Sequence, residues 1–188
     1  MPKPNLSTYT GKNLLLFELT PHDIDIEDIA HGLACINRFN GQVKKPISVA
    51  QHSVYVARIA MKLSGPRAGL QGLLHDASEA YIGDMTKWLK QAPEMKEFRI
   101  KEARIQHTIY RRFRCRALLY SSVEYADRIM VRYEGMRGYK QPFIDHPDYP
   151  PLTKEEKRLV GPWGFWSWQS AESIFLTEYE ILTHELYA

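Results

Sequence analysis

The sequence predicts an all-α protein, a compact helical bundle preceded by a short irregular or β N-terminal segment. From residue 25 onward, apolar residues recur with the three- and four-residue spacing of amphipathic helices. Residues that start and stop helices flank these segments. No convincing pair of alternating strands appears after residue 22. The length of 188 residues fits one domain, residues 1–188, that can bury a real core.

The N-terminal part of the chain is expected to hold a β segment and two helices. Residues 1–22 are irregular or short β, because the stretch NLLLFEL could form a strand or one arm of a hairpin. A first helix begins at Asp25 and ends near NRFNG, where asparagine and glycine disfavour its continuation. A second helix begins at Ser48, because Ser48 and Gln51 have the spacing of a capping box.

The middle of the chain predicts two further helices joined by a short turn. The first covers residues 66–81, with a proline in its first turn and Gly83 as a left-handed cap. Asp84 is expected to cap the short MTKWLK turn that follows. The second helix covers residues 93–113.

The C-terminal part predicts two longer helices around an irregular segment. Ser121 and Glu124 have the spacing of a capping box and announce a helix in which Asp127 lies inside the apolar stripe. Residues 138–165 contain several prolines and are expected to be the least regular segment, with one short helix at TKEEKRLV. A final amphipathic helix covers residues 168–186.

Composition indicates an ordinary soluble, cytoplasmic protein. No apolar run reaches the length of a membrane span, and the N-terminus lacks the apolar core of a secretory signal. Cys35 and Cys115 are far apart and are interpreted as reduced thiols. The net charge of +3 is mild, so nucleic acid is not expected as the main partner, whereas a small anionic substrate fits.

The stretch LLHDASEAYIGD places His75 and Asp76 side by side in an apolar helix, where ionisable groups are uncommon. His52 and Asp127 also fall on apolar helix faces. Taken singly, each has an ordinary explanation, a satisfied core histidine or a salt-bridged aspartate. Together, two imidazoles and two carboxylates make a suitable cage for a divalent first-row metal. Consecutive helical residues are about 100° apart, so His75 and Asp76 could reach one ion.

The order His52, His75-Asp76, Asp127 resembles the HD-domain metal-dependent phosphohydrolase superfamily. The stretches INRF, SVAQHSVYVA, LLHDASEAYIGD and YADRI are similar, in order and spacing, to the bacterial HD-domain 5'-deoxynucleotidases and their phage-borne relatives. This resemblance covers residues 26–135. It implies an all-α bundle, the class that the periodicity predicts independently.

The resemblance also implies a role for each matching residue. His52, His75, Asp76 and Asp127 match the ligands of one divalent metal ion, for which Mn, Co, Zn and Fe are all suitable. Glu79 matches the acid that orients or deprotonates the attacking water, Asp84 an acid near the sugar and scissile phosphate, and Arg38 a phosphate-binding arginine. Phe39 replaces a tryptophan that shapes the sugar pocket, and Lys87 could add positive charge from the turn after Asp84.

The expected function is a metal-dependent phosphohydrolase that releases phosphate from (deoxy)nucleoside 5'-monophosphates. One alternative is a dNTP triphosphohydrolase with the same site, which would release triphosphate from dATP. Another is a non-catalytic nucleotide-binding protein that keeps the metal as a structural clamp. Relatives of this kind suggest a homodimer.

Overall fold

The computed structural model describes residues 5–141 and 149–187. Residues 1–4, 142–148 and 188 lie outside the described residues, and they include the start of the predicted β segment and the middle of the predicted irregular segment 138–165. The remaining chain confirms the all-α class, since its only sheet in the described ranges is a two-stranded hairpin.

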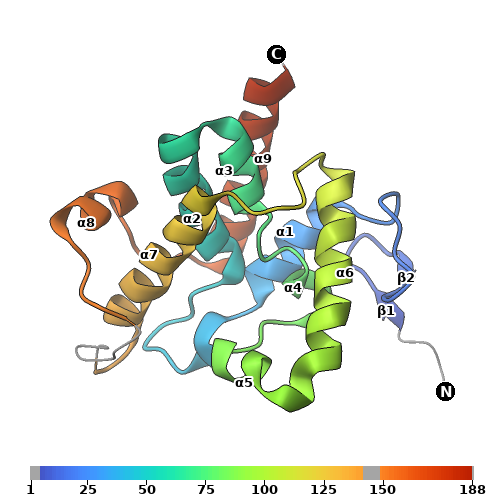
Figure 1. Ribbon diagram of the computed structural model, residues 1–188, viewed down its shortest axis with the longest axis horizontal. Helices are drawn as coiled ribbons and strands as arrows, with labels where there is room; N and C mark the ends of the chain where they lie inside the picture. Colours follow the sequence, from blue (N-terminus) through green and yellow to red (C-terminus); the bar gives the residue numbers. More distant parts are fainter. Residues whose placement is uncertain (1–4, 142–148, 188) are drawn as a thin grey trace.

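A central helix, α2 (Val49–Ser64), organises the bundle. It contacts α1 (Ile26–Cys35), α3 (Pro66–Leu73), α7 (Ser121–Gly138) and α9 (Trp168–Tyr187), as Figure 1 shows. Every residue of α2 from Val49 to Ala57 is buried. A helix that is covered on all sides in this way belongs to the interior of the fold. Any side chain on this part of α2, polar or not, is therefore placed inside the protein.

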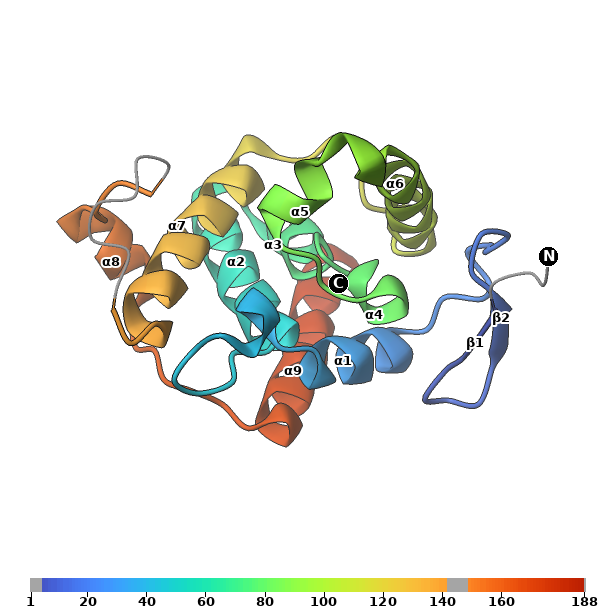
Figure 2. The ribbon, with the colours of Figure 1, turned by 90° about the horizontal axis from the view of Figure 1, so that it is seen from below.

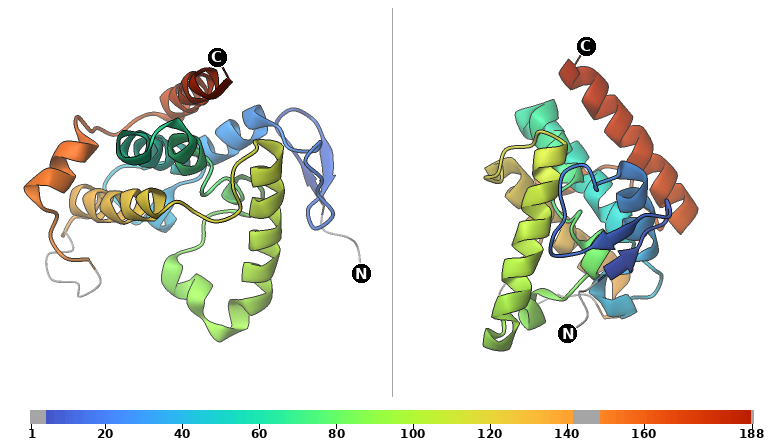
Figure 3. Two further views of the ribbon diagram at one scale, coloured as in Figure 1. Left: turned by 45° about the horizontal axis from the view of Figure 1, so that its top comes forward. Right: turned by 90° about the vertical axis from the view of Figure 1, so that its right-hand side faces the viewer.

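Shorter elements surround this centre. The antiparallel hairpin β1 (Asn5–Ser7) and β2 (Asn13–Leu15) lies at the outer edge, with Leu6 opposite Leu14. The helix α6 (Lys96–Arg112) follows the 3₁₀ turn η2 (Pro93–Met95) and α5 (Lys87–Gln91), and these elements form an arm beside the bundle (Figure 3). The short α8 (Lys154–Val160) packs against α2 and α7.

Two clusters of buried apolar side chains fill the bundle. The larger one joins α1, α2, α3 and α9, and includes Leu33, Leu73 and Phe175. The smaller one lies between α2 and α7, and includes Ile59 and Met130. Because α2 contributes to both, it fixes the distance between α3 on one side and α7 on the other.

The first predicted helix is shorter than expected. It ends at Cys35, and Asn37 then forms an isolated bridge with Ser48. The following residues, Arg38–Gly41, form the 3₁₀ turn η1, in which Phe39 and Asn40 have positive φ values of 58° and 50°. Left-handed residues cannot continue a right-handed helix. Arg38 therefore lies on a turn beside the start of α2 and not on the first helix.

The helix predicted for residues 66–81 is broken. It consists of α3, a turn over residues 74–78 and the short α4 (Glu79–Ile82), so His75 and Asp76 do not lie on a regular helix. The Nδ1 atom of His75 is 2.7 Å from the carbonyl oxygen of Gly72, which competes with regular helical bonding. The side chain of Gln106 accepts from the backbone N–H of Ser78 and donates to the carbonyl of Leu74. These side chains satisfy the backbone that the broken helix leaves unpaired.

The predicted helix caps have mixed outcomes. Ser48 caps α2 by accepting from the N–H of Gln51, as predicted, but the Gln51 side chain does not complete a capping box and bonds elsewhere. No side chain caps α7, so the box predicted from Ser121 and Glu124 is wrong. Asp84 does not cap α5 either, since the residue at that position is Thr86 and it makes no cap bond.

Other predicted elements are confirmed. The helix predicted for residues 93–113 appears as η2 and α6, the short helix at TKEEKRLV as α8, and the last helix as α9. Gly83 ends α4 with a positive φ of 82°, where glycine carries no Cβ penalty. Among the described helices, none is both long enough and apolar enough to cross a bilayer.

Candidate functional site

Two histidines face each other between α2 and the turn after α3, with His52 fully buried and the His75 side chain 7% exposed. Their ring centroids are 5.3 Å apart. His52 is on α2, and its Nδ1 lies 3.0 Å from Oε1 of Glu134; His75 has its Nδ1 against the Gly72 carbonyl. Because a carbonyl or an ionised carboxylate can only accept, each Nδ1 carries a proton, and Nε2 is the nitrogen of each ring that faces the other groups of the site. Both Nε2 atoms are buried, and the polar groups nearest to them are the carboxylates of Asp127 and Asp76.

Two carboxylates complete this group. Oδ1 of Asp127 is 3.1 Å from Nε2 of His52 and 3.9 Å from Nε2 of His75. Oδ2 of Asp76 is 3.2 Å from Nε2 of His75 and 3.8 Å from Nε2 of His52. The candidate ligand atoms of His52, His75 and Asp127 all lie within 4.8 Å of one another. Imidazole nitrogens that converge with carboxylate oxygens are a donor set that fits a divalent first-row cation.

Strong electrostatic interactions act on this group. Burial opposes ionisation of Asp76, but His75, His52 and Arg38 outweigh it and hold the pKa of Asp76 below its ordinary value. Burial and the charge of Arg38 lower the pKa of His52, whereas Glu134 and Asp127 raise it more, to about 9. Without a cation, a proton on His52 offsets the surrounding negative charge. A bound cation would take the place of that proton.

A cavity of about 520 Å³ opens beside this group. Its volume lies in the range of roughly 300–1,000 Å³ that small-molecule sites occupy. Figure 2 shows α5 placed near α4 and α7, the elements that supply much of the lining. Of the predicted site residues, all except the two histidines line the cavity: Arg38, Phe39, Asp76, Glu79, Asp84, Lys87 and Asp127.

Glu79 is a buried carboxylate on this cavity wall. Its Oε2 has no hydrogen-bond partner in the described structure, and its Oε1 lies 3.6 Å from Nζ of Lys90. Burial, and then the charges of Asp76 and Asp84, raise the pKa of Glu79 well above its ordinary value. Burial, with Asp76, also raises the pKa of Asp84. Both acids therefore hold protons more tightly than free carboxylic acids do.

Arg38 and Phe39 reach the cavity from the turn η1. The guanidinium of Arg38 lies 5.5 Å from the centre of the Phe39 ring, and that ring meets Tyr139 edge to face at 5.5 Å. The positive φ of Phe39 is unusual for an aromatic residue and costs about 1–3 kcal/mol. This backbone geometry turns two consecutive side chains toward the same cavity.

Two relatives match most of the chain. An uncharacterized protein of Rhodobacter capsulatus is 37% identical over 135 residues, which are 67% of this chain and 68% of that protein. The uncharacterized protein YfdR of Escherichia coli K12 is 31% identical over 129 residues, 69% of each chain. The chain belongs to the family of these two proteins. No family model matches it. Because both relatives of this family are uncharacterized, the chemistry has to be argued from the site.

The most important residue that the sequence prediction missed is Glu134. It is fully buried on α7, accepts from Nε of Arg38 at 2.9 Å, and also contacts His52. Arg38 in turn places Nη1 3.5 Å from Oδ2 of Asp76. The sequence does contain one indication of Glu134, because it follows Asp127 by seven residues and so lies on the same face of the helix.

The sequence prediction also missed Lys90 and named Lys87 as the source of positive charge from this part of the chain. Both line the cavity from α5, but only Lys90 contacts the acidic groups, Glu79 at 3.6 Å and Glu102 at 2.7 Å. Lys87 instead lies over the ring of Trp88 at 5.6 Å. The two lysines are three residues apart, and the sequence pattern alone does not tell which one faces inward.

Proposed function

We propose that the protein is a metal-dependent phosphohydrolase that releases phosphate from nucleoside 5'-monophosphates. The observation that carries this proposal is the pair of buried Nε2 atoms of His52 and His75, which lie 3.1 Å and 3.2 Å from two carboxylate oxygens at the wall of a cavity lined by charged side chains and aromatic rings. It agrees with the resemblance of residues 26–135 to the HD-domain phosphohydrolases.

His52, His75, Asp76 and Asp127 are the residues that would hold one divalent ion, with Mn, Co, Zn and Fe as candidates. When bound, such an ion would act as a Lewis acid that lowers the pKa of a water molecule and offsets negative charge on the phosphoryl oxygens. Arg38 presents a planar fork for phosphate oxygens, and Glu134 holds that fork in place before substrate arrives. Because the Arg38 side chain is already fixed, substrate binding does not have to reduce its conformational entropy.

Glu79 and Asp84 carry the proton transfers in this proposal. Glu79 has a raised pKa and a free Oε2, so it accepts a proton from the attacking water more readily than an exposed glutamate does. Asp84, whose pKa is also raised, lies on the same cavity wall, where it can position the sugar or assist the leaving 5'-oxygen. Trp88, Tyr139 and Phe39 offer rings for the sugar and base.

The test is a phosphate-release assay on a panel of nucleoside monophosphates and triphosphates with each divalent ion, followed by identification of products. Glu79→Gln should bind the same amount of metal as the wild type and lose turnover by at least about a hundredfold. Glu97→Gln, an exposed glutamate on α6, is the matched control and should keep full activity. Absence of phosphate-ester hydrolysis by metal-loaded wild type, or full activity in Glu79→Gln, would contradict the proposal.

A dNTP triphosphohydrolase is the second candidate. The cavity is lined by Arg38, Lys87, Lys90 and Arg99 alongside four carboxylates, so cationic side chains other than Arg38 are present for further phosphate groups. Release of triphosphate from dATP, with no phosphate released from monophosphates, would select this candidate. The homodimer and the cytoplasmic location are further parts of the proposal, and size measurements in solution would test the first.

A further inference from the structure

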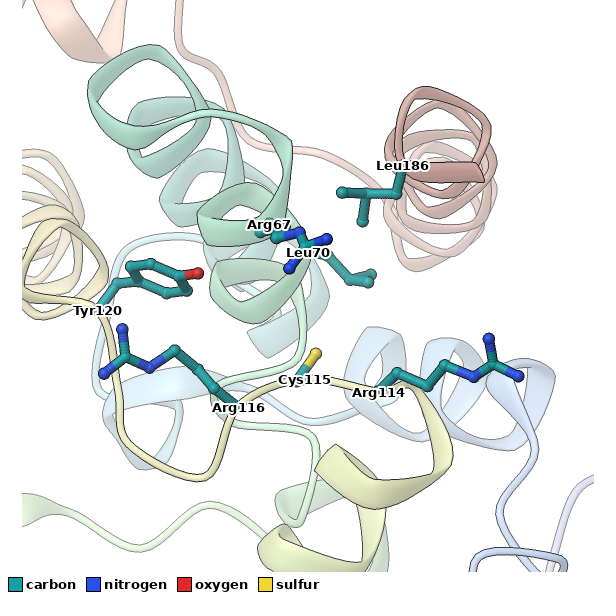
Figure 4. A pocket seen from close by; sticks show the side chains of 7 residues that line it. All are labelled: Arg67, Leu70, Arg114, Cys115, Arg116, Tyr120 and Leu186. Carbon is teal, nitrogen blue, oxygen red and sulfur yellow. The ribbon is translucent and has the colours of Figure 1, made fainter. Parts of the chain in front are cut away.

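A second cavity lies where the start of α3, the loop after α6 and the end of α9 meet. It has a volume of about 340 Å³. Among the described residues it shares no lining residue with the cavity beside His52 and His75. Figure 4 shows the side chains that line it, which include three arginines and no acidic residue. The arginines are Arg67, Arg114 and Arg116, and the other lining residues are Leu70, Cys115, Tyr120 and Leu186.

The loop that carries two of the arginines is held in a fixed form. Gln71 is fully buried on α3, and its amide donates to the carbonyls of Arg116 and Leu118 at 2.8 Å and 3.2 Å. Its carbonyl oxygen accepts from the N–H of Tyr120 at 2.8 Å. One buried side chain therefore satisfies three backbone groups of the loop, and the cavity is formed in advance of any ligand.

Among the described residues, the lining of this cavity contains cationic side chains and no carboxylate. In the described chain, neither Arg67 nor Arg116 forms an ion pair with a carboxylate, and the Arg116 guanidinium lies 4.6 Å from the centre of the Tyr120 ring. The hydroxyl of Tyr120 points toward the middle of the cavity, above Cys115 (Figure 4). Burial raises the pKa of the Cys115 thiol to about 12, so that thiol is neutral and adds no counter-charge.

We propose that this cavity binds the phosphate group of a small phosphorylated ligand, as a second anion site separate from the proposed catalytic one. Guanidinium groups match phosphate oxygens in geometry and charge, and the Tyr120 hydroxyl can donate to the same group. Leu70 and Leu186 form an apolar wall for the rest of the ligand. A neighbouring hollow of about 200 Å³ shares Leu70 and Arg114 and adds Arg112, so that a second phosphate also finds a cation.

The experiment titrates the metal-loaded protein with inorganic phosphate and, separately, with ADP, using isothermal calorimetry at low salt in buffer with excess divalent ion. Arg67→Gln and Arg116→Gln should each raise the dissociation constant about tenfold, because each removes a charge-assisted contact. Both side chains are exposed, so the fold should not suffer. Arg111→Gln, an exposed arginine of α6 outside the cavity lining, is the matched control and should bind like the wild type.

A further variant separates this site from the proposed catalytic one. Asp127→Asn alters the candidate metal group and should leave binding at the arginine cavity unchanged. If phosphate and ADP bind with equal affinity, the site recognises a single phosphate group. If ADP binds more tightly, the neighbouring hollow with Arg112 or the apolar wall of Leu70 and Leu186 contributes to binding. The proposal would be overturned if the wild type did not bind either ligand, or if Arg67→Gln and Arg116→Gln bound as tightly as the wild type and Arg111→Gln. Loss of binding in Asp127→Asn alone would also overturn it.

Discussion

Glu134 connects two residues that the candidate site needs in fixed positions. It accepts from Nδ1 of His52 and from Nε of Arg38 while being fully buried itself. The first contact fixes the tautomer that leaves Nε2 available, and the second holds the guanidinium beside Asp76. A glutamine has the same shape but cannot accept with both terminal atoms, so one of these donors would be left unpaired.

We predict that Glu134→Gln lowers divalent-metal affinity by about 10- to 100-fold. The measurement is competition with a chelator of known affinity, with folding checked by thermal melting. Glu178→Gln is the matched control, since Glu178 is also a buried glutamate paired with an arginine, Arg58 at 2.7 Å, but lies outside the candidate site. Equal metal affinity in both variants would show that Glu134 does not position the histidine.

The sequence predicted most of the residues that the structure brings together at the candidate site, because each carries local chemistry that is visible in the chain. His75 and Asp76 stand out in an apolar segment, and His52 and Asp127 lie on core-facing positions. Glu134 was missed because its role depends on Arg38, which is 96 residues away in the chain. The seven-residue spacing from Asp127 indicates the helix face of Glu134, but only the fold shows that Arg38 and His52 are its partners.

At the scale of elements, helix existence could be predicted better than helix ends. The periodicity of residues 66–81 is helical throughout, but the chain breaks at 74–78 because His75 and Gln106 take over the backbone bonding there. Similarly, Gln51 has the correct spacing for a capping box but bonds to a distant segment. Tertiary contacts outweigh local propensity at both places.

The crossing of α1 and α4 provides a prediction about packing. A Cβ placed on Gly32 would lie 2.9 Å from Cβ of Ala80 and 3.1 Å from its backbone. Gly32→Ala should therefore lower the free energy of unfolding by about 1–3 kcal/mol and displace α4, which carries Glu79. Urea denaturation measures the first effect. Gly164→Ala, which meets nothing within 4 Å, is the control, and similar losses in both variants would contradict the packing argument.

The capping box of α8 provides a prediction about pH. Thr153 and Glu156 bond reciprocally, and Glu156 also pairs with Arg132. Burial opposes ionisation of Glu156, but the Thr153 N–H and Arg132 outweigh it and hold its pKa below the ordinary 4.5. A carboxylate with a lowered pKa in the folded state stabilises the protein above pH 4.5, and this contribution is lost as pH falls through the lower value.

Glu156→Gln should therefore be less stable than the wild type at neutral pH, and the difference should shrink as the pH is lowered below 4.5. Urea denaturation at several pH values measures both. Glu155→Gln changes the neighbouring, exposed glutamate and should show little difference at any pH. A constant deficit of Glu156→Gln across this range would mean that its charge is not what stabilises α8.

At the scale of the whole molecule, the candidate metal ligands come from three separate places. His52 is on α2, His75 and Asp76 are in the turn after α3, and Asp127 is on α7. In the unfolded chain these groups are far apart, so a bound cation favours only the folded state. An ion would thus act as a cross-link between the helices that carry both core clusters.

We predict that chelation of the metal lowers the melting temperature, and that adding the divalent ion raises it in a concentration-dependent way. The stabilisation should reach about 2.7 kcal/mol at an ion concentration 100 times the dissociation constant. Asp127→Ala should abolish the response. A melting temperature that does not change with ion concentration in the wild type would contradict a metal site at this group.

Gln51 links the C-terminal part of the chain to the residue next to His52. Its amide donates to the carbonyl of Gly164 at 2.7 Å and accepts from the N–H of Trp166 at 3.1 Å, from inside α2. A protein shortened before residue 164 would therefore leave a buried amide with two empty bonding positions one residue from a candidate ligand. Truncation at that point is a poor strategy for obtaining a minimal fragment that keeps the candidate site, however far it lies from the histidines in sequence.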